Sequence, residues 1–133
     1  LRNYELLNSI KGIGTINAMN TIIHTNNFQA FETARQYACY LGIAPFEHSS
    51  GTSIKGKTRV YPTGAKLLKA DLSQAANSAI VWDKEMKEYY ERKRKEGKAY
   101  GVVLNAVKFK LVGRMFAVVK RGTPFVELMT YKK

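Results

Sequence analysis

Cysteine, histidine and proline are scarce in this chain of 133 residues, which holds one cysteine, two histidines and three prolines. The single cysteine, Cys39, excludes an internal disulfide and a zinc site built from several cysteines. With only His24 and His48 beside it, the chain has too few ligands for a structural metal, and we expect no metal site. A lone cysteine is also typical of a reducing, intracellular compartment.

Long apolar runs and a targeting signal are missing as well. The most apolar stretch, Ala99–Val119, is interrupted by Lys108, Lys110 and Arg114, which disfavours a transmembrane helix and a membrane partner. The first residues, LRNYELLNSI, have no basic segment before an apolar run, so they predict no signal peptide. They also lack an initiator methionine, and we therefore expect a piece of a longer protein.

Acidic residues are few and unevenly balanced. The chain has 22 lysines and arginines against 10 aspartates and glutamates, a net charge of +12. Residues 1–50 hold three basic and three acidic residues, whereas residues 51–133 hold nineteen basic and seven acidic ones. Like charge gathered in one part of a chain is typical of a binding surface or an arm. The partner that it favours is a polyanion, namely DNA, RNA or an anionic membrane, and of these we expect nucleic acid.

The hydrophobic pattern predicts a mainly α fold: a single helical domain with a long basic loop. Apolar positions at helical spacing and glycine stops indicate six helices. They are Tyr4–Ile10, Thr15–His24 with Thr15 as its cap, Phe31–Leu41 ending at Gly42, Ala65–Trp82, Lys84–Lys95 ending at Gly97, and Val102–Lys120 ending at Gly122. The longest irregular segment is 46–64, and residues 123–133 are expected to form a tail. We expect Trp82 and Cys39 to pack in the core.

The first candidate site is a glycine turn between the first two helices, Lys11-Gly12-Ile13-Gly14-Thr15. This is a helix-hairpin-helix pattern. Two glycines allow a tight turn and a close approach to a phosphate, which the N–H groups at the start of the next helix would face. Ile13 would hold the turn against the core. The alternative is a plain turn that uses glycine only for its geometry.

The segment Gly51–Thr58 matches the phosphate-binding pattern G-x-x-x-x-G-K-[ST] at every position. That motif works only between a buried strand and a helix that starts at its Lys-Thr pair. No apolar strand precedes it, and Pro62 with Gly64 is expected to exclude a helix after it. We therefore interpret the segment as part of a basic loop facing one polyanion and expect no ATP binding. The cations concerned are Lys55, Lys57, Arg59, Lys66 and Lys69.

Ser50 is the candidate nucleophile, and Ser49 is the less favoured one. A serine hydroxyl needs a base or a metal to activate it and cations to stabilise the developing charge. Ser50 precedes Gly51 and is followed by a run of cations, which suits attack on a phosphodiester. His48 is close enough in sequence to act as a base, although a solvated loop histidine is the preferred interpretation.

The order of these patterns resembles a known family. A helix-hairpin-helix comes first, then the segment 34–45 (ARQYACYLGIAP), then HSSG at 48–51, a Lys-Gly-Lys loop and Leu67-Leu68. This set looks like the C-terminal domain of the Piv/MooV-type insertion-sequence transposases, bridge-RNA-guided recombinases with a RuvC-like domain at the N-terminus. The resemblance implies a domain over residues 1–122, with the hairpin at 4–24, the basic loop at 46–64 and a helical bundle at 65–121.

The resemblance also implies a mechanism and partners. Family members transpose or recombine DNA with a guide RNA, and the serine before glycine, here Ser50, attacks the DNA. Mg²⁺ is held by acidic residues of the N-terminal domain, which have no counterpart here, so no cofactor is expected in this chain and the chain alone is expected to be inactive. The full protein is expected to form homo-oligomers on the chromosome in the cytoplasm of a bacterial or archaeal cell. The alternative function is a helix-hairpin-helix module that binds nucleic acid without catalysis.

Overall fold

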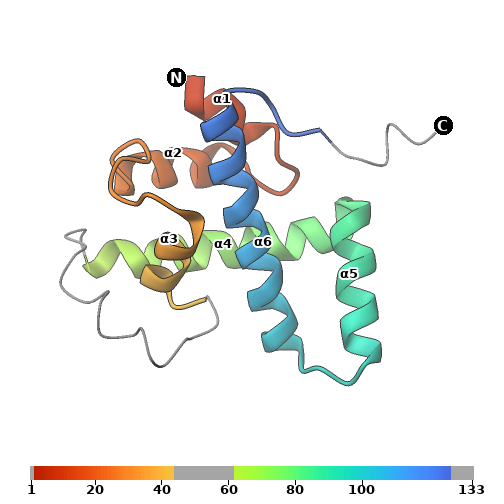
Figure 1. Ribbon diagram of the computed structural model, residues 1–133. Helices are drawn as coiled ribbons and strands as arrows, with labels where there is room; N and C mark the ends of the chain where they lie inside the picture. The colour runs from red at the N-terminus through yellow and green to blue at the C-terminus, as the bar shows by residue number, and fades with distance from the viewer. Residues whose placement is uncertain (1, 44–61, 127–133) are drawn as a thin grey trace.

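The computed structural model describes residues 2–43 and 62–126. Within these residues the chain forms six α-helices and no strand, so the expected mainly α fold is confirmed (Figure 1). The helices are α1 (Arg2–Asn8), α2 (Thr15–His24), α3 (Ala34–Leu41), α4 (Pro62–Trp82), α5 (Lys84–Lys95) and α6 (Tyr100–Arg121).

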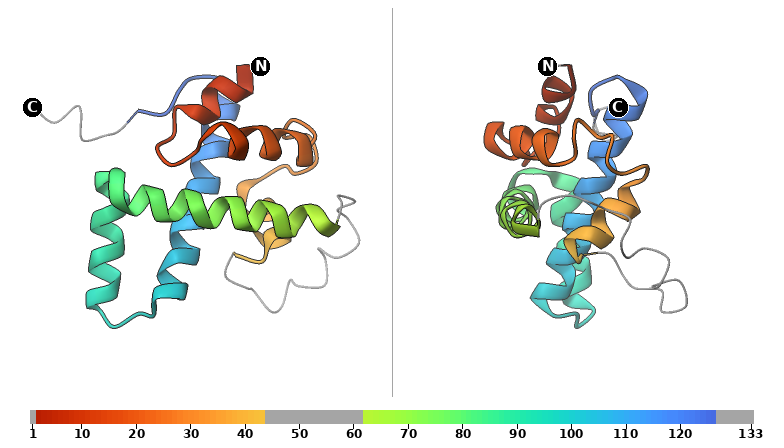
Figure 2. Two further views of the ribbon diagram at one scale, coloured as in Figure 1. Left: turned by 180° about the vertical axis from the view of Figure 1, so that it is seen from behind. Right: turned by 90° about the vertical axis from the view of Figure 1, so that its left-hand side faces the viewer.

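The two longest helices organise the molecule. In Figures 1 and 2, α4 runs across the middle and α6 crosses it. Helix α6 contacts α1, α3, α4 and α5, and α4 contacts α2, α3, α5 and α6. The end of α6 returns to the start of the chain, where the Arg2 guanidinium donates a hydrogen bond of 2.8 Å to the carbonyl of Gly122. The α1–α2 pair therefore lies at one end of α6, and α5 lies beside the other end.

The core is built by the apolar faces of these two helices. One face of α4 is buried, as its spacing predicts, and so is a stripe along α6. The buried residues of α4 are Leu68, Leu72, Ala75, Ala76 and Ala79, and the stripe of α6 comprises Leu104, Val107, Leu111, Met115 and Val118. Small alanines on α4 let a neighbouring backbone approach closely, which becomes important at the glycine turn.

Caps form at both ends of α3, at the start of α5 and at the end of α6. Thr33 accepts a hydrogen bond of 3.1 Å from the N–H of Gln36 at the start of α3, and Asp83 accepts one of 3.0 Å from the N–H of Met86 at the start of α5. Gly42 and Gly122 end α3 and α6 in the left-handed conformation, both with φ of 77°. The two glycine stops predicted at these positions are confirmed.

Two predictions about helix starts are wrong. Thr15 does not cap α2, because the capping position is Gly14 and no side chain caps the helix there. The prediction that Pro62 and Gly64 exclude a helix is also wrong, since α4 begins at Pro62. Proline suits the first position of a helix, where its missing N–H has no intrahelical partner. The P-loop pattern, with the Lys57-Thr58 pair at which its helix would start, lies outside the described residues.

The other deviations are smaller. Helix α1 begins at Arg2, two residues earlier than expected, and α3 begins at Ala34, three residues later than expected. Helix α6 begins two residues earlier than expected. Cys39 is half-buried against the core. Trp82 was expected to pack, but 71% of its surface is exposed. No helix in the described part of the chain is long and apolar enough to cross a membrane.

Candidate nucleic-acid interface

The glycine turn between α1 and α2 packs directly on α4. Gly12 has φ of +98°, and a Cβ atom there would lie 2.8 Å from the carbonyl oxygen of Ala75. Ile13 is 4% exposed and fixes the turn in the core, as predicted. Gly12 is therefore required by the close contact between two backbones, which is a structural reason for glycine where the sequence suggested contact with a phosphate.

Gly14 has a different environment. It adopts extended backbone, φ −96° and ψ −170°, and nothing lies within 4 Å of a Cβ built on it. Its neighbour Thr15 is exposed, and the Thr15 hydroxyl accepts a hydrogen bond of 3.3 Å from the hydroxyl of Tyr4. The start of α2 is thus open at the residue where the helix-hairpin-helix interpretation places a ligand.

A cavity of about 400 Å³ lies between this turn and α4. Gln74 and Ser78 of α4 supply uncharged donors along its wall, opposite Gly14 and Thr15. Asp71 also lines it, and the carboxylate of Asp71 accepts a hydrogen bond of 2.9 Å from the amide of Asn20. The Asp71 carboxylate at the wall disfavours a second anion close to it.

The structure separates the lysines of α4 from the turn. Lys66 and Lys69 are exposed. Since α-helices have 3.6 residues per turn, Lys69 lies about 120° around the helix from Ala75, and Lys66 lies roughly on the opposite side. Lys69 reaches α3, where its ammonium nitrogen is 3.8 Å from the position of a Cβ on Gly42. Lys11 is exposed beside the turn. Among the described residues, Lys11 therefore lies beside the glycine turn, whereas Lys66 and Lys69 lie on other sides of α4.

The remaining predicted site residues lie outside the described residues. These are Ser49 and Ser50 with His48 before them, and the loop cations Lys55, Lys57 and Arg59.

Lys108 is a residue that sequence reasoning missed. It interrupts the apolar stretch of α6, yet it is only 8% exposed. Burial lowers the pKa of its ammonium group, and the positive charge of Lys69 lowers it further. The signal that could have predicted its burial is helical spacing, because Lys108 falls on the same face of the helix as Leu104 and Leu111.

The basic end of α5 is organised around Tyr89. The charged groups of Arg92, Lys93 and Lys110 lie 5.4, 5.8 and 4.6 Å from the centre of its ring. Cations held over an aromatic face gain attraction from the ring quadrupole. Tyr89 is occupied by these cations, so it is less suited to stack on a base than the exposed Trp82.

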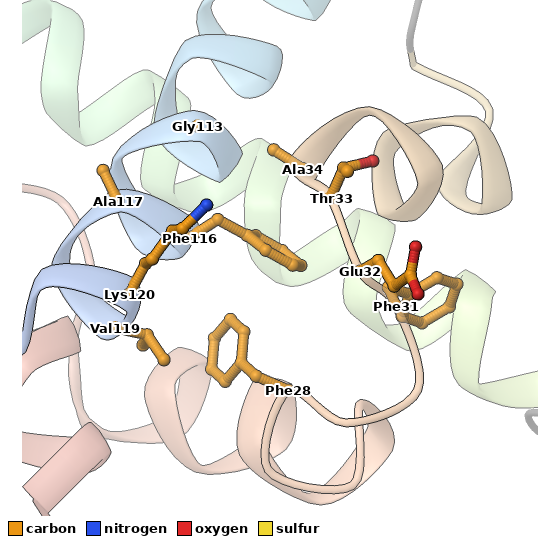
Figure 3. Close-up of a pocket in the computed structure, with 10 residues that line it drawn as sticks. All are labelled: Phe28, Phe31, Glu32, Thr33, Ala34, Gly113, Phe116, Ala117, Val119 and Lys120. Atoms are coloured by element: carbon orange, nitrogen blue, oxygen red, sulfur yellow. The ribbon is translucent and has the colours of Figure 1, made fainter.

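A second cavity, of about 490 Å³, lies between the α2–α3 connection and α6 (Figure 3). The ring of Phe28 meets that of Phe116 edge-on, with their centres 5.0 Å apart. Asn26, Asn27 and Phe28 all have positive φ, between 53° and 69°, and this left-handed turn directs Phe28 toward α6. The cavity is apolar, with Glu32 and Lys120 at its rim, so it does not resemble a phosphate site.

No group of three or more histidine, cysteine, aspartate or glutamate side chains that could hold a metal ion occurs among residues 2–43 and 62–126. The residues of this part of the chain therefore do not fit a Mg²⁺ site of their own.

The regular structure in residues 2–43 and 62–126 is helical, and the chain is strongly basic. A basic balance of this kind is a feature of proteins that bind nucleic acid. The sequence matches the model of the family "Transposase IS116/IS110/IS902" over residues 4–91. The chain belongs to this transposase family.

Three relatives, one named for an insertion element and two named for gene inversion, match nearly the whole chain. It is 30% identical over 118 residues to the insertion element IS110 uncharacterized 43.6 kDa protein of Streptomyces coelicolor, covering 89% of this chain and 29% of that protein. It is 27% identical over 123 residues to the pilin gene-inverting protein of Moraxella bovis, and 28% over 127 residues to that of Moraxella lacunata. These matches cover 91% and 92% of this chain but only 38% and 39% of those proteins.

Proposed function

We propose that this chain is the DNA-binding, serine-bearing C-terminal domain of an insertion-sequence transposase. The observation that carries the proposal is the family match over residues 4–91, which includes the glycine turn, Ser50 and the basic loop in one stretch. The net charge of +12, all of it after Ser50, supports a polyanionic substrate. The names of the Moraxella relatives refer to gene inversion, which is consistent with a recombination reaction.

In the proposed reaction, the Ser50 hydroxyl oxygen forms an ester bond with a DNA phosphorus atom. The bond from that phosphorus to one deoxyribose oxygen breaks, and the proton lost by serine balances the one gained by the released hydroxyl. Neighbouring cations stabilise the additional negative charge on the phosphate oxygens. Lys55, Lys57 and Arg59 are the proposed cations.

The remaining partners belong to the longer protein. We propose that an acidic RuvC-like domain supplies Mg²⁺, and that a guide RNA and further copies of the protein complete the assembly. Since no acidic cluster for a metal occurs in the described residues, no step of the reaction is assigned to Mg²⁺ in this chain.

The test uses the longer protein with its RNA and a DNA substrate. Protease digestion and peptide mass measurement should find a phosphodiester adduct on the peptide that contains Ser50. Ser50→Ala should abolish both the adduct and transposition, whereas Ser49→Ala, the matched control one residue away, should retain them.

An adduct on another residue would contradict the serine assignment. Normal transposition by Ser50→Ala would favour the second candidate, a helix-hairpin-helix module that binds nucleic acid without catalysis. The open start of α2 at Gly14 is the observation that supports this alternative.

A further inference from the structure

The single tryptophan of the chain lies on the surface. Trp82 is the last residue of α4, and 71% of its surface is exposed, next to Val81, which is 57% exposed. Among residues 2–43 and 62–126, no other aromatic ring and no cation stacks on the indole. Tryptophan is highly buried on average, so an indole left open to water needs an explanation.

Trp82 lies close to the glycine turn. Gly12 packs on α4, where a Cβ atom on it would lie 2.8 Å from the carbonyl oxygen of Ala75 and 3.4 Å from the Cβ of Ala79. Because α-helices have 3.6 residues per turn, Trp82 lies on nearly the same side of α4 as Ala75, roughly one turn beyond Ala79. Figures 1 and 2 show the loop between α1 and α2 beside the corner at which α4 meets α5. Trp82 is therefore at the edge of the turn.

The groups near Trp82 are of two kinds. Ser78 and Gln74, about one and two turns earlier on α4, supply uncharged hydrogen-bonding groups to the cavity between α4 and the turn. Lys11 beside the turn and Lys84 at the start of α5 are exposed cations. This combination suits a single strand of nucleic acid, because cations attract the backbone while an aromatic face stacks on a base. Bases inside a duplex are already stacked on both faces and would have to leave the helix to reach the indole.

We propose that the indole of Trp82 stacks on an unpaired base of a DNA strand whose backbone passes the glycine turn. This inference rests on the proposed DNA-binding function and adds a single-stranded site to it. The proposed reaction breaks a DNA strand, and a broken strand that is joined to other DNA must leave its duplex, so unpaired bases arise close to the protein. A base carries no charge, so the Asp71 carboxylate in the adjoining cavity, which disfavours a phosphate there, does not oppose it.

The first test uses the fluorescence of Trp82, which reports on this position alone because the chain has no second tryptophan. The 133-residue chain is mixed with a single-stranded DNA of about 12 nucleotides, with the blunt duplex of the same sequence and with the corresponding single-stranded RNA. Excitation is at wavelengths where tyrosine absorbs little. Single-stranded DNA should quench most of the fluorescence because the base stacks on the indole, whereas a saturating amount of duplex should leave it nearly unchanged.

The second test replaces the indole and measures binding to labelled DNA by fluorescence anisotropy. Trp82→Ala should weaken the binding of single-stranded DNA about tenfold, the loss expected for one stacked base, and should change duplex binding less than about twofold. Trp82→Phe keeps an aromatic face and should lose less. The matched control is Val81→Ala, which shortens the neighbouring exposed apolar side chain and should keep single-strand binding within about twofold of the unmodified chain.

Urea unfolding separates this role from a structural one. Because Trp82 and Val81 are both exposed, the substituted chains should unfold at nearly the same urea concentration as the unmodified chain. Should Trp82→Ala fail to fold, the fluorescence of the unmodified chain still decides whether a single strand reaches the indole.

The possible failures are distinguishable. If the unmodified chain binds neither duplex nor single-stranded DNA, the proposed function itself is contradicted. If it binds DNA but the single strand leaves the fluorescence unchanged, or if Trp82→Ala binds the single strand as tightly as Val81→Ala, only the stacking site is overturned, and a contact with protein becomes the explanation for the exposed indole. Equal quenching by the duplex would overturn the requirement for an unpaired base. Quenching by RNA alone would overturn DNA as the bound strand, whereas quenching by both strands would support the stacking site, since every base has an aromatic face.

Discussion

Gly12 and Gly14 of the same turn have different roles, and the same change to serine at each position can distinguish these roles. Gly12→Ser should destabilise the chain by about 2 kcal/mol, because the residue has φ of +98° and its Cβ would collide with the Ala75 carbonyl. Gly14→Ser should be neutral or stabilise by up to about 1 kcal/mol, since serine caps helices well and the space there is open. Urea unfolding monitored by circular dichroism checks both variants. Equal losses would contradict the packing role assigned to Gly12.

Tyr37 should make the fold sensitive to alkali. It is 1% exposed, and burial raises the pKa of its phenol, with a hydrogen bond involving Thr21 opposing part of the shift. Because the folded pKa exceeds the unfolded value of about 10, the stabilisation is complete below pH 10 and is lost as the pH rises beyond it. The free energy of unfolding should fall above pH 10, and less steeply in Tyr37→Phe. Parallel pH profiles for the two proteins would sink this expectation.

At the scale of the helices, an ion triad fixes the corner between α4 and α5. Asp83 caps α5 and also pairs with Arg114 of α6 at 2.7 Å, and both side chains are largely buried. Arg114 makes a second pair of 2.7 Å with Glu85, whose side chain is 58% exposed. The guanidinium also lies 4.3 Å from the ring centre of Phe125. Through this triad, one arginine connects the start of α5 to α6 and to the last described residues.

Asp83→Ala should therefore destabilise the chain by about 3–5 kcal/mol, because it removes a cap and leaves a buried guanidinium without its buried anion. Glu85→Ala, the control at the exposed end of the same triad, should cost less than about 1 kcal/mol. Chemical denaturation of both variants provides the comparison. Similar losses for Asp83→Ala and Glu85→Ala would show that burial does not set the strength of the triad.

Most of the helices could be predicted from the sequence because their signals are local. Apolar spacing located the buried faces of α4 and α6, and glycine stops located Gly42 and Gly122. What failed depends on contacts between distant segments. The exposure of Trp82, the burial of Lys108 and the contact of Gly12 with Ala75 all arise from packing between helices, which spacing along one helix does not reveal. The start of α4 at Pro62 was missed because proline was interpreted only as a helix breaker.

At the candidate interface, the sequence predicted which residues would contact nucleic acid, and the structure places those that it describes on different elements of the fold. The glycine turn and Lys69 were expected to bind nucleic acid as parts of two separate candidate sites, and Lys69 lies about 120° around α4 from Ala75, against which the turn packs. A basic chain can follow a DNA backbone with several separate contacts, so this separation favours an extended surface over a single pocket. The family membership accounts for the order of the motifs, and it does not by itself locate the phosphates.

The whole molecule should bind nucleic acid through charge and without sequence preference. If the basic surface covers about five phosphates, log affinity should fall with log salt at a slope of roughly −4 to −5 on duplex DNA. Fluorescence anisotropy with two unrelated duplexes of equal length measures the slope and the preference together. A flat response to salt would remove the electrostatic argument, and a strong preference for one duplex would require contacts with base edges.

Binding and cleavage should be separable at this scale. Given DNA and Mg²⁺, the 133-residue chain should bind without cutting and without covalent attachment, because a serine hydroxyl needs a base or a metal to remove its proton. Among residues 2–43 and 62–126 no acidic cluster could place a metal ion near DNA, and lysine and arginine stay protonated at neutral pH. Denaturing electrophoresis with labelled DNA detects both cut strands and slow-moving adducts.

Adding the acidic domain and its RNA should produce the adduct, and Ser50→Ala should remove it while leaving the salt-dependent binding in place. Efficient cleavage by the chain alone would mean that it contains its own activating group, and the division of labour between the two domains would then be wrong.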